Sequence, residues 1–155
     1  MDPSHYASAL NLTYLAFKIN TLEQGEIYRF EIQASLDFET ATGVIEFLIN
    51  RGPEEGLLQA SPHTGKELST EFRFTAEEWV DPEEDFPILY GFKYLNKYMQ
   101  PAWMKKPLEN AEFVTTLPYA GANCTLVLLH AEDSLETSKE VYITIGIEEL
   151  DLSER

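Results

Sequence analysis

The residues best suited to chemistry are acidic side chains gathered around Trp79. Six carboxylates follow one another closely in this stretch: Glu77, Glu78, Asp81, Glu83, Glu84 and Asp85. Carboxylate oxygens are the hard ligands that calcium prefers, so the stretch predicts a calcium site. The predicted ligands are Asp81, Glu83, Glu84 and Asp85. The Asp-x-Asp-x-Asp-Gly spacing of a dedicated calcium loop is missing, and a solvated acidic rim is the alternative interpretation.

Paired acids also suit glycoside hydrolysis, which needs two carboxylates on opposite sides of a cleft. Acids gathered on one turn of a small module provide no such cleft. The sequence also lacks a phosphate-binding glycine loop, a dinucleotide glycine pattern, a nucleophile elbow and a zinc-binding helix. The protein is therefore predicted not to be an enzyme, and calcium is the single cofactor considered.

A second group of residues combines aromatic rings, methionines and a lysine in a loop-like stretch between two strands. Its members are Tyr98, Met99, Trp103, Met104 and Lys105. Aromatic and cationic side chains on an otherwise acidic protein predict a docking site for a protein partner or a glycan. The alternative is a crossover that folds over the end of the domain.

The single cysteine, Cys124, excludes an internal disulfide and a cysteine-based metal site. It is expected to be buried as a small hydrophobic residue. The three histidines, His5, His63 and His130, lack the spacing of metal ligands, so structural or solvent-facing roles are expected for them.

Two acceptor patterns for N-glycosylation occur, Asn11-Leu-Thr13 and Asn123-Cys-Thr125. Glycan attachment at Asn11 and Asn123 is accordingly predicted, which favours an extracellular location.

The formal charge of -16, with 27 acids against 11 Lys and Arg, repels phosphate backbones and anionic lipid heads. Binding to nucleic acid or to a membrane surface is therefore not expected. No apolar run approaches the length of a membrane span, and the first residues lack the pattern of a signal peptide. If the protein is secreted, the chain is expected to be a fragment or a mature form.

In the segments that must position these groups, apolar and polar residues alternate with a period of two, which is typical of half-buried strands. In the stretch 69–76, Phe72, Phe74 and Ala76 share one face. Further strands are predicted at 88–95, 125–129 and 141–147. The strand at 125–129 is apolar on both faces and is expected to be central, whereas the strand at 141–147 is expected to be apolar on one face. Glycine, proline, asparagine and aspartate separate the strands, and this arrangement predicts an all-β, antiparallel sandwich.

The first third of the chain predicts about three further strands: one through Leu15, Phe17 and Ile19, and two at 28–36 and 44–49. Leu22, Gly25 and Tyr28 have the spacing of a tyrosine corner, in which the tyrosine hydroxyl bonds to the backbone upstream. Over residues 11–50 the sequence is similar to fibronectin type III domains. A related segment near Leu117 has Asn123 at the tyrosine position, so the corner there is expected to be degenerate.

A more specific resemblance covers about residues 51–148. The order Ser61-Pro-His-Thr-Gly65, a strand, Trp79-Val-Asp81-Pro, then a strand with aromatic residues at Tyr90, Phe92 and Tyr94 resembles the receptor-for-egg-jelly (REJ) module of polycystins and related ciliary or gamete surface proteins. The cysteine pair that such modules often carry near their first two strands is absent. The resemblance implies immunoglobulin-like or fibronectin type III-like sandwiches in tandem.

Three segments are predicted on this basis. Residues 1–50 form the C-terminal strands of an incomplete sandwich, residues 51–148 form a complete REJ-like sandwich, and residues 149–155 form an acidic tail or linker. The open apolar face of the first segment is expected to be covered by upstream residues or by strands of a partner. One enlarged sandwich made from all the strands is the alternative.

The resemblance implies a non-catalytic structural or adhesion module of a large extracellular or ciliary surface protein. Its expected partners are other proteins or neighbouring modules of the same chain. The alternatives are a carbohydrate-binding accessory module of a secreted protein, with Tyr98 and Trp103 as sugar platforms, and an intracellular assembly module.

Overall fold

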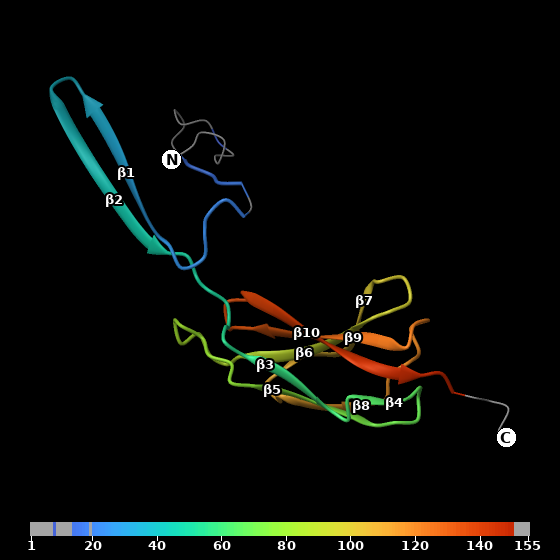
Figure 1. The fold of residues 1–155 in the computed structure, drawn as a ribbon. Helices are drawn as coiled ribbons and strands as arrows, with labels where there is room; N and C mark the ends of the chain where they lie inside the picture. Colours follow the sequence, from blue (N-terminus) through green and yellow to red (C-terminus); the bar gives the residue numbers. More distant parts are fainter. Residues whose placement is uncertain (1–7, 9–13, 19, 151–155) are drawn as a thin grey trace. The chain divides into compact units, whose positions relative to one another are not determined.

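The fold was analysed in a computed structural model, which describes residue 8, residues 14–18 and residues 20–150 (Figure 1). Every regular element of these residues is a strand, so the all-β prediction is confirmed. The described residues contain no helix that is long and apolar enough to cross a membrane. The chain divides into two compact units, Met1–Asn50 and Arg51–Arg155.

The regular structure of the first unit is an antiparallel ribbon of two strands, β1 (Ile27–Leu36) and β2 (Glu39–Leu48). Directly opposed residues of such a ribbon share a face. One face is apolar except at the turn, where Glu39 is paired with Leu36: it carries Tyr28, Phe30, Ile32, Ala34 and Leu36 from β1, with Ala41, Gly43, Ile45 and Phe47 from β2. The other face is more polar: it carries Ile27, Val44 and Leu48 together with Arg29, Glu31, Gln33, Ser35, Thr40, Thr42 and Glu46. The ribbon is therefore amphipathic, as the alternation in the sequence predicts.

The predicted tyrosine corner is present in this unit. The backbone N–H of Glu23 donates a hydrogen bond to the hydroxyl oxygen of Tyr28 at 3.0 Å. Gly25 has a φ of 79°, which a residue with a side chain rarely adopts, and its N–H donates to the carbonyl of Ile49 at 2.8 Å. The corner thus ties the chain before β1 to the end of β2.

The predicted third strand through Leu15, Phe17 and Ile19 is not among the named strands. Ile19 lies outside the described residues. The ring of Phe17 packs against Phe30 with centroids 5.1 Å apart, so this segment contacts the apolar face of the ribbon.

The second unit contains two sheets (Figure 1). The smaller has the order β3-β5-β8, and its strands are β3 (Leu57–Ser61), β5 (Phe72–Glu77) and β8 (Glu112–Thr115). The larger has the order β4-β10-β9-β6-β7, and its strands are β4 (Thr64–Lys66), β6 (Leu89–Leu95), β7 (Pro101–Leu108), β9 (Cys124–Glu132) and β10 (Ser138–Glu148). All pairs are antiparallel except β4 with β10.

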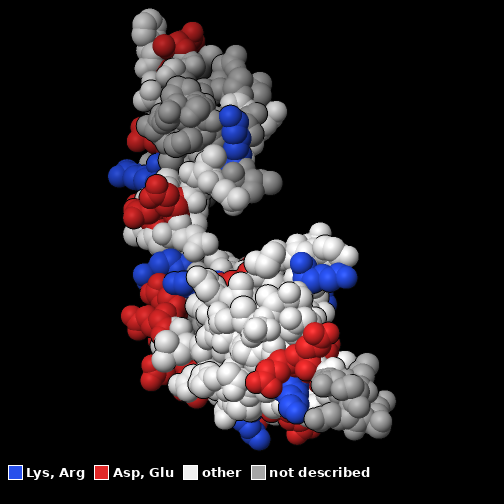
Figure 2. Space-filling model, turned by 45° about the vertical axis from the view of Figure 1, so that its right-hand side comes forward, with Lys and Arg blue, Asp and Glu red and all other residues white. Residues whose placement is uncertain are grey.

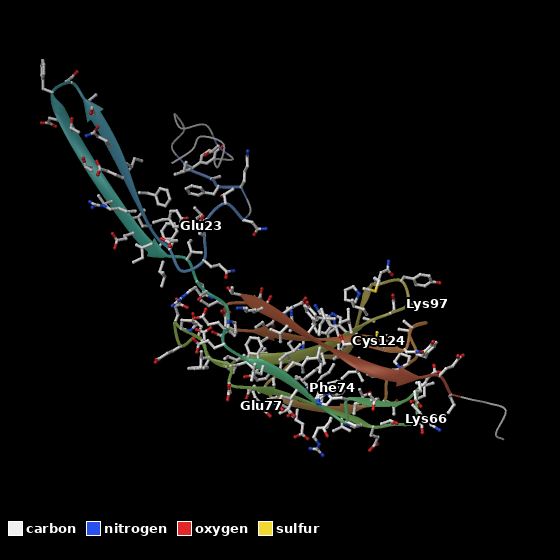
Figure 3. The ribbon with its side chains drawn as sticks, in the orientation of Figure 1. Glu23, Lys66, Phe74, Glu77, Lys97 and Cys124 are labelled. Carbon is white, nitrogen blue, oxygen red and sulfur yellow. The ribbon has the colours of Figure 1, made fainter. Side chains whose placement is uncertain are left out.

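Aromatic residues join the two sheets in the core. The ring of Phe92 on β6 lies 6.3 Å from that of Phe74 on β5 and 5.6 Å from that of Phe113 on β8, measured between centroids. Figure 3 shows Phe74 in the interior of the unit. On the central strand β9, alternate residues from Thr125 to Ala131 are buried. The buried face of β5, with Phe72, Phe74 and Ala76, is the face predicted from the sequence.

Trp79 lies in the core, as the sequence predicts. It is 9% exposed, and its indole N–H donates to the carbonyl of Leu57 at 3.3 Å. A Cβ atom on Gly56 would lie 1.9 Å from the nearest indole atom. The ring therefore packs directly against the backbone at Gly56, which leaves no room for a side chain there.

Two local predictions are wrong. Cys124 is exposed rather than buried, because Thr125, the next residue of the strand, takes the inward position. The loop-like stretch predicted around Trp103 is strand β7 instead. Prolines at 101 and 107 obscure that strand in the sequence, but β7 lies at the edge of its sheet, where proline is tolerated.

Candidate functional site

The acidic turn between β5 and β6 is organised by Asp81. This residue is 5% exposed, and its Oδ1 atom accepts hydrogen bonds from the backbone N–H groups of Glu83 and Asp85, each at 3.0 Å. A similar turn joins β9 to β10, where Oδ1 of Asp133 accepts bonds from the N–H groups of Leu135 and Thr137. Both aspartates thus stabilise the turns in which they lie, through hydrogen bonds from the side chain to the backbone.

Like charges crowd together at this end of the second unit. Burial, followed by the charges of Asp81, Asp133 and Glu83, raises the pKa of Asp85. Arg51 provides the nearby positive charge, since its Nε atom donates to Glu83 at 3.0 Å. This hydrogen bond is the main cause that raises the pKa of Arg51.

The four predicted calcium ligands are not equivalent in the fold. Asp81 is buried, Glu83 and Asp85 are half-buried, and Glu84 is exposed. Atoms Oδ2 of Asp81 and Oε2 of Glu83 are buried without a hydrogen-bond partner. No group of three or more His, Cys, Asp or Glu side chains that could hold a metal ion occurs in the described parts of the chain. Calcium binding at this turn stays a prediction.

The predicted docking group is divided between two faces. Tyr98 and Met99 are 71% and 66% exposed at the turn from β6 to β7, and Trp103 is 38% exposed. Met104 instead packs against the core. Lys105 is half-buried, and its ammonium group donates to the carbonyls of Asn110 and Glu112 at 2.6 and 3.2 Å. Burial lowers the pKa of Lys105.

An irregularity in the pairing of β6 with β7 causes this division. Phe92 is paired with Lys105, whereas the next residue, Lys93, is paired with Trp103. Met104 is thus an extra residue on β7, as in a β-bulge, and the strand turns different side chains to each face. Trp103 comes to lie on the outer face of the sheet, together with Lys93.

The outer face of the large sheet holds a connected group of side chains that the sequence analysis missed. The ammonium of Lys93 lies 4.2 Å from the ring centroid of Trp103 and donates to Oε1 of Glu140 at 2.5 Å. His130 meets Trp103 edge to face at 5.5 Å. Its two ring nitrogens lie 3.0 Å from a carboxylate oxygen of Glu132 and 3.1 Å from one of Glu140. We refer to Lys93, Trp103, His130, Glu132 and Glu140 as the outer-face cluster.

Two opposing effects act on the pKa of Glu140 in this cluster. Burial alone would raise the pKa of this carboxyl, but hydrogen bonds from Lys93 and His130 outweigh burial and lower its pKa. Alternation along each strand could have identified the outward residues in advance. Only the register of four paired strands brings them together.

The indole of Trp103 is not a bare platform. Besides Lys93, the ammonium of Lys106 lies 4.8 Å from its ring centroid. A Cβ atom on Gly91 would lie 2.6 Å from the ring, so the indole rests against the backbone of β6. A sugar that stacks on this ring would have to displace a cation–π contact, which disfavours the carbohydrate-platform interpretation.

The two predicted glycosylation positions differ in what the structure describes. Asn11 lies outside the described residues. Asn123 is exposed immediately before β9, and its backbone carbonyl accepts a hydrogen bond from Ile147. Thr125 of the same acceptor pattern is buried, with its hydroxyl 3.5 Å from the carbonyl of Pro118.

Charge is unevenly distributed over the surface. In Figure 2, Asp and Glu form clusters along the left-hand edge and near the lower end of the face shown, Lys and Arg form separate spots, and much of the face is uncharged. Lys97, at the turn between β6 and β7, is one of the exposed cations (Figure 3).

A search of curated proteins found no match. Among protein families, the REJ domain matches residues 3–154, which is almost the whole chain. The chain therefore belongs to the REJ domain family, a polycystin-type module found in the extracellular regions of surface proteins.

Proposed function

We propose that this chain is a non-catalytic assembly module of a large extracellular or ciliary surface protein, which works by packing against other protein surfaces. One observation carries the proposal. The apolar face of the β1–β2 ribbon leaves Ile32 65%, Leu36 77% and Ile45 61% exposed. A continuous apolar face of this kind is costly in water and typical of an interaction surface.

The structure of the ribbon indicates what kind of partner would cover its apolar face. A two-stranded ribbon is marginally stable alone and gains stability when a second β-layer covers its apolar face. The tyrosine corner fixes the base of the ribbon, so the face is presented in a defined shape. A neighbouring module or a protein partner that supplies a β-layer fits this surface.

The test compares two matched double variants by light scattering after size-exclusion chromatography over a range of concentrations. Ile32→Ser/Ile45→Ser alters the apolar face. Ile27→Ser/Val44→Ser alters exposed apolar residues of the opposite face, which are 65% and 51% exposed. We expect the unaltered chain to self-associate or to bind an apolar dye, the first variant to lose this behaviour, and the second to keep it.

Equal effects of both variants would contradict a face-specific role. A chain that stays monomeric and binds no dye at any concentration would contradict the proposal as a whole.

A further inference from the structure

The hairpin formed by β6 and β7 differs in charge from the rest of the protein. Residues 89–108 contain four lysines, at positions 93, 97, 105 and 106, and no acid. The remaining residues contain all 27 acids and the other seven of the 11 Lys and Arg residues. A cationic segment in such an acidic protein creates a local attraction for negative charge that the chain as a whole does not have.

Two of the four lysines are already used inside the fold. Lys93 is paired with Glu140, and Lys105 bonds to the carbonyls that follow β7. Lys97 and Lys106 are exposed, and neither forms an ion pair with a described residue. Their charge is therefore available to a partner.

Each of these two lysines lies beside an exposed aromatic ring. The ammonium of Lys97 is 5.0 Å from the centroid of Tyr98, and that of Lys106 is 4.8 Å from the centroid of Trp103. Met99, at the turn, adds further exposed apolar surface. The hairpin thus combines cations with apolar side chains at two places along its length.

The turn that carries Tyr98 and Met99 is held in shape by Asn96. Its side-chain oxygen accepts hydrogen bonds from the N–H groups of Tyr98 and Gln100 at 2.9 and 3.1 Å, and its carbonyl accepts one from Met99 at 2.8 Å. Less conformational entropy is lost when a partner binds a surface that is already ordered.

From these observations we propose that the β6–β7 hairpin binds a short acidic peptide segment that carries an apolar side chain. The acids of the peptide pair with Lys97 and Lys106, and its apolar side chain packs against the exposed Tyr98 and Met99 at the turn. This rests on the proposed function, because it names the partner class for a second contact surface of the same module. An extended octapeptide reaches about 26 Å, enough to follow the hairpin from its turn to Lys106.

Charge outside the hairpin favours a peptide over larger anions. A membrane, a nucleic acid or a long sulfated glycan would extend beyond the hairpin, and all 27 acids of the chain lie outside residues 89–108. Like charges repel within the screening distance of about 8 Å at physiological ionic strength. A short peptide can contact Lys97 and Lys106 without extending over the rest of the acidic chain. Recognition by strand addition to β7 is also disfavoured, since Pro101 and Pro107 have no N–H to donate.

The experiment measures fluorescence anisotropy of a labelled octapeptide of Glu and Asp with two Phe residues, titrated with the full chain. We expect saturable binding that weakens as salt rises from about 50 to 150 mM. Lys97→Gln/Lys106→Gln should weaken the affinity about tenfold. The matched control Lys66→Gln/Lys139→Gln removes the same charge from two exposed lysines elsewhere, and should change the affinity less than about twofold.

Further probes separate the contributions of charge and apolar contact. A peptide with Gln in place of its acids should not bind, and one with Ala in place of Phe should bind more weakly. Near-ultraviolet circular dichroism of each variant checks that the surroundings of Trp79 and Trp103 are unchanged.

Three outcomes would overturn the proposal: no saturation with the acidic peptide at low salt, equal losses in the two double variants, or tighter Lys97- and Lys106-dependent binding to phosphatidylserine vesicles or heparin. None of these depends on the β1–β2 ribbon. Failure here would therefore leave the light-scattering test of the proposed function intact, and failure of that test would leave this one intact.

Discussion

At the scale of single residues, the acidic turn shows how one environment gives neighbouring carboxylates different roles. Oδ1 of Asp81 accepts hydrogen bonds from two backbone N–H groups, which hold the turn in shape. The carboxylate of Asp85 accepts no backbone hydrogen bond of this kind from a described residue, and burial together with Asp81, Asp133 and Glu83 raises its pKa. The folded chain thus favours ionised Asp85 less than the unfolded chain does, so its charge opposes folding at neutral pH.

Replacing Asp85 by Asn should raise the melting temperature at pH 7, because it removes the disfavoured charge. The folded pKa lies above the unfolded one, so the cost of the charge disappears as pH falls and Asp85 becomes protonated. At about pH 3, below the ordinary aspartate pKa of about 3.9, the gain should vanish. Thermal unfolding followed by circular dichroism in a chelating buffer provides the measurement. Glu84→Gln, at an exposed neighbour, is the control, and an equal gain at both pH values would refute the explanation.

At the scale of elements, β6 connects the core to the outer surface. Its inward residue Phe92 packs against two aromatic rings of the smaller sheet, Phe74 on β5 and Phe113 on β8. Its outward residue Lys93 belongs to the outer-face cluster. The strand lies between β9 and β7, so its position is fixed on both edges by hydrogen bonds. The core therefore determines where the cluster and the cationic hairpin lie.

Phe92→Ala should lower the free energy of unfolding of the second unit by about 3–5 kcal/mol, the usual cost of deleting a buried aromatic ring. Tyr142→Ala, on β10 of the same sheet, removes a ring that is 71% exposed and should cost about 0.5 kcal/mol or less. Urea unfolding monitored by tryptophan fluorescence measures both. Similar losses for the two variants would contradict the assignment of Phe92 to the centre of the core.

At the scale of the whole molecule, the two units differ in how much hydrophobic surface each buries. The buried hydrophobic cluster of the described residues, from Leu58 to Ile147, lies entirely within the second unit. The first unit has an amphipathic ribbon with a largely exposed apolar face. The second unit therefore contains a complete core, whereas the ribbon depends more on what covers it.

A fragment of residues 51–155 should accordingly fold without the first unit. We expect its melting temperature to stay within about 4 °C of that of the full chain, which corresponds to a difference of about 1 kcal/mol or less in a domain of this size. Its near-ultraviolet spectrum should be retained, since both tryptophans, Trp79 and Trp103, lie in it. An unfolded fragment would show that residues before Arg51 are needed for the core.

Much of this fold follows from alternation that the sequence shows directly. The inward faces of β5 and β10, the apolar face of β1 and the tyrosine corner at Tyr28 all depend on residues close together in the chain, so local patterns predict them. The strand through Trp103 was hidden by two prolines, whose effect depends on whether the strand lies at an edge. The exposure of Cys124 likewise depends on the point at which β9 begins.

The sequence by itself determined β1, β2, β5, β6, β9 and β10, the strong negative charge and the kinship with REJ domains, because each of these is local or additive along the chain. Only the tertiary structure decided that Trp103 meets Lys93 and His130, and that Met104 and Lys105 leave the predicted docking group. Strand register and a β-bulge bring distant residues together, and neither has a local signature in the sequence.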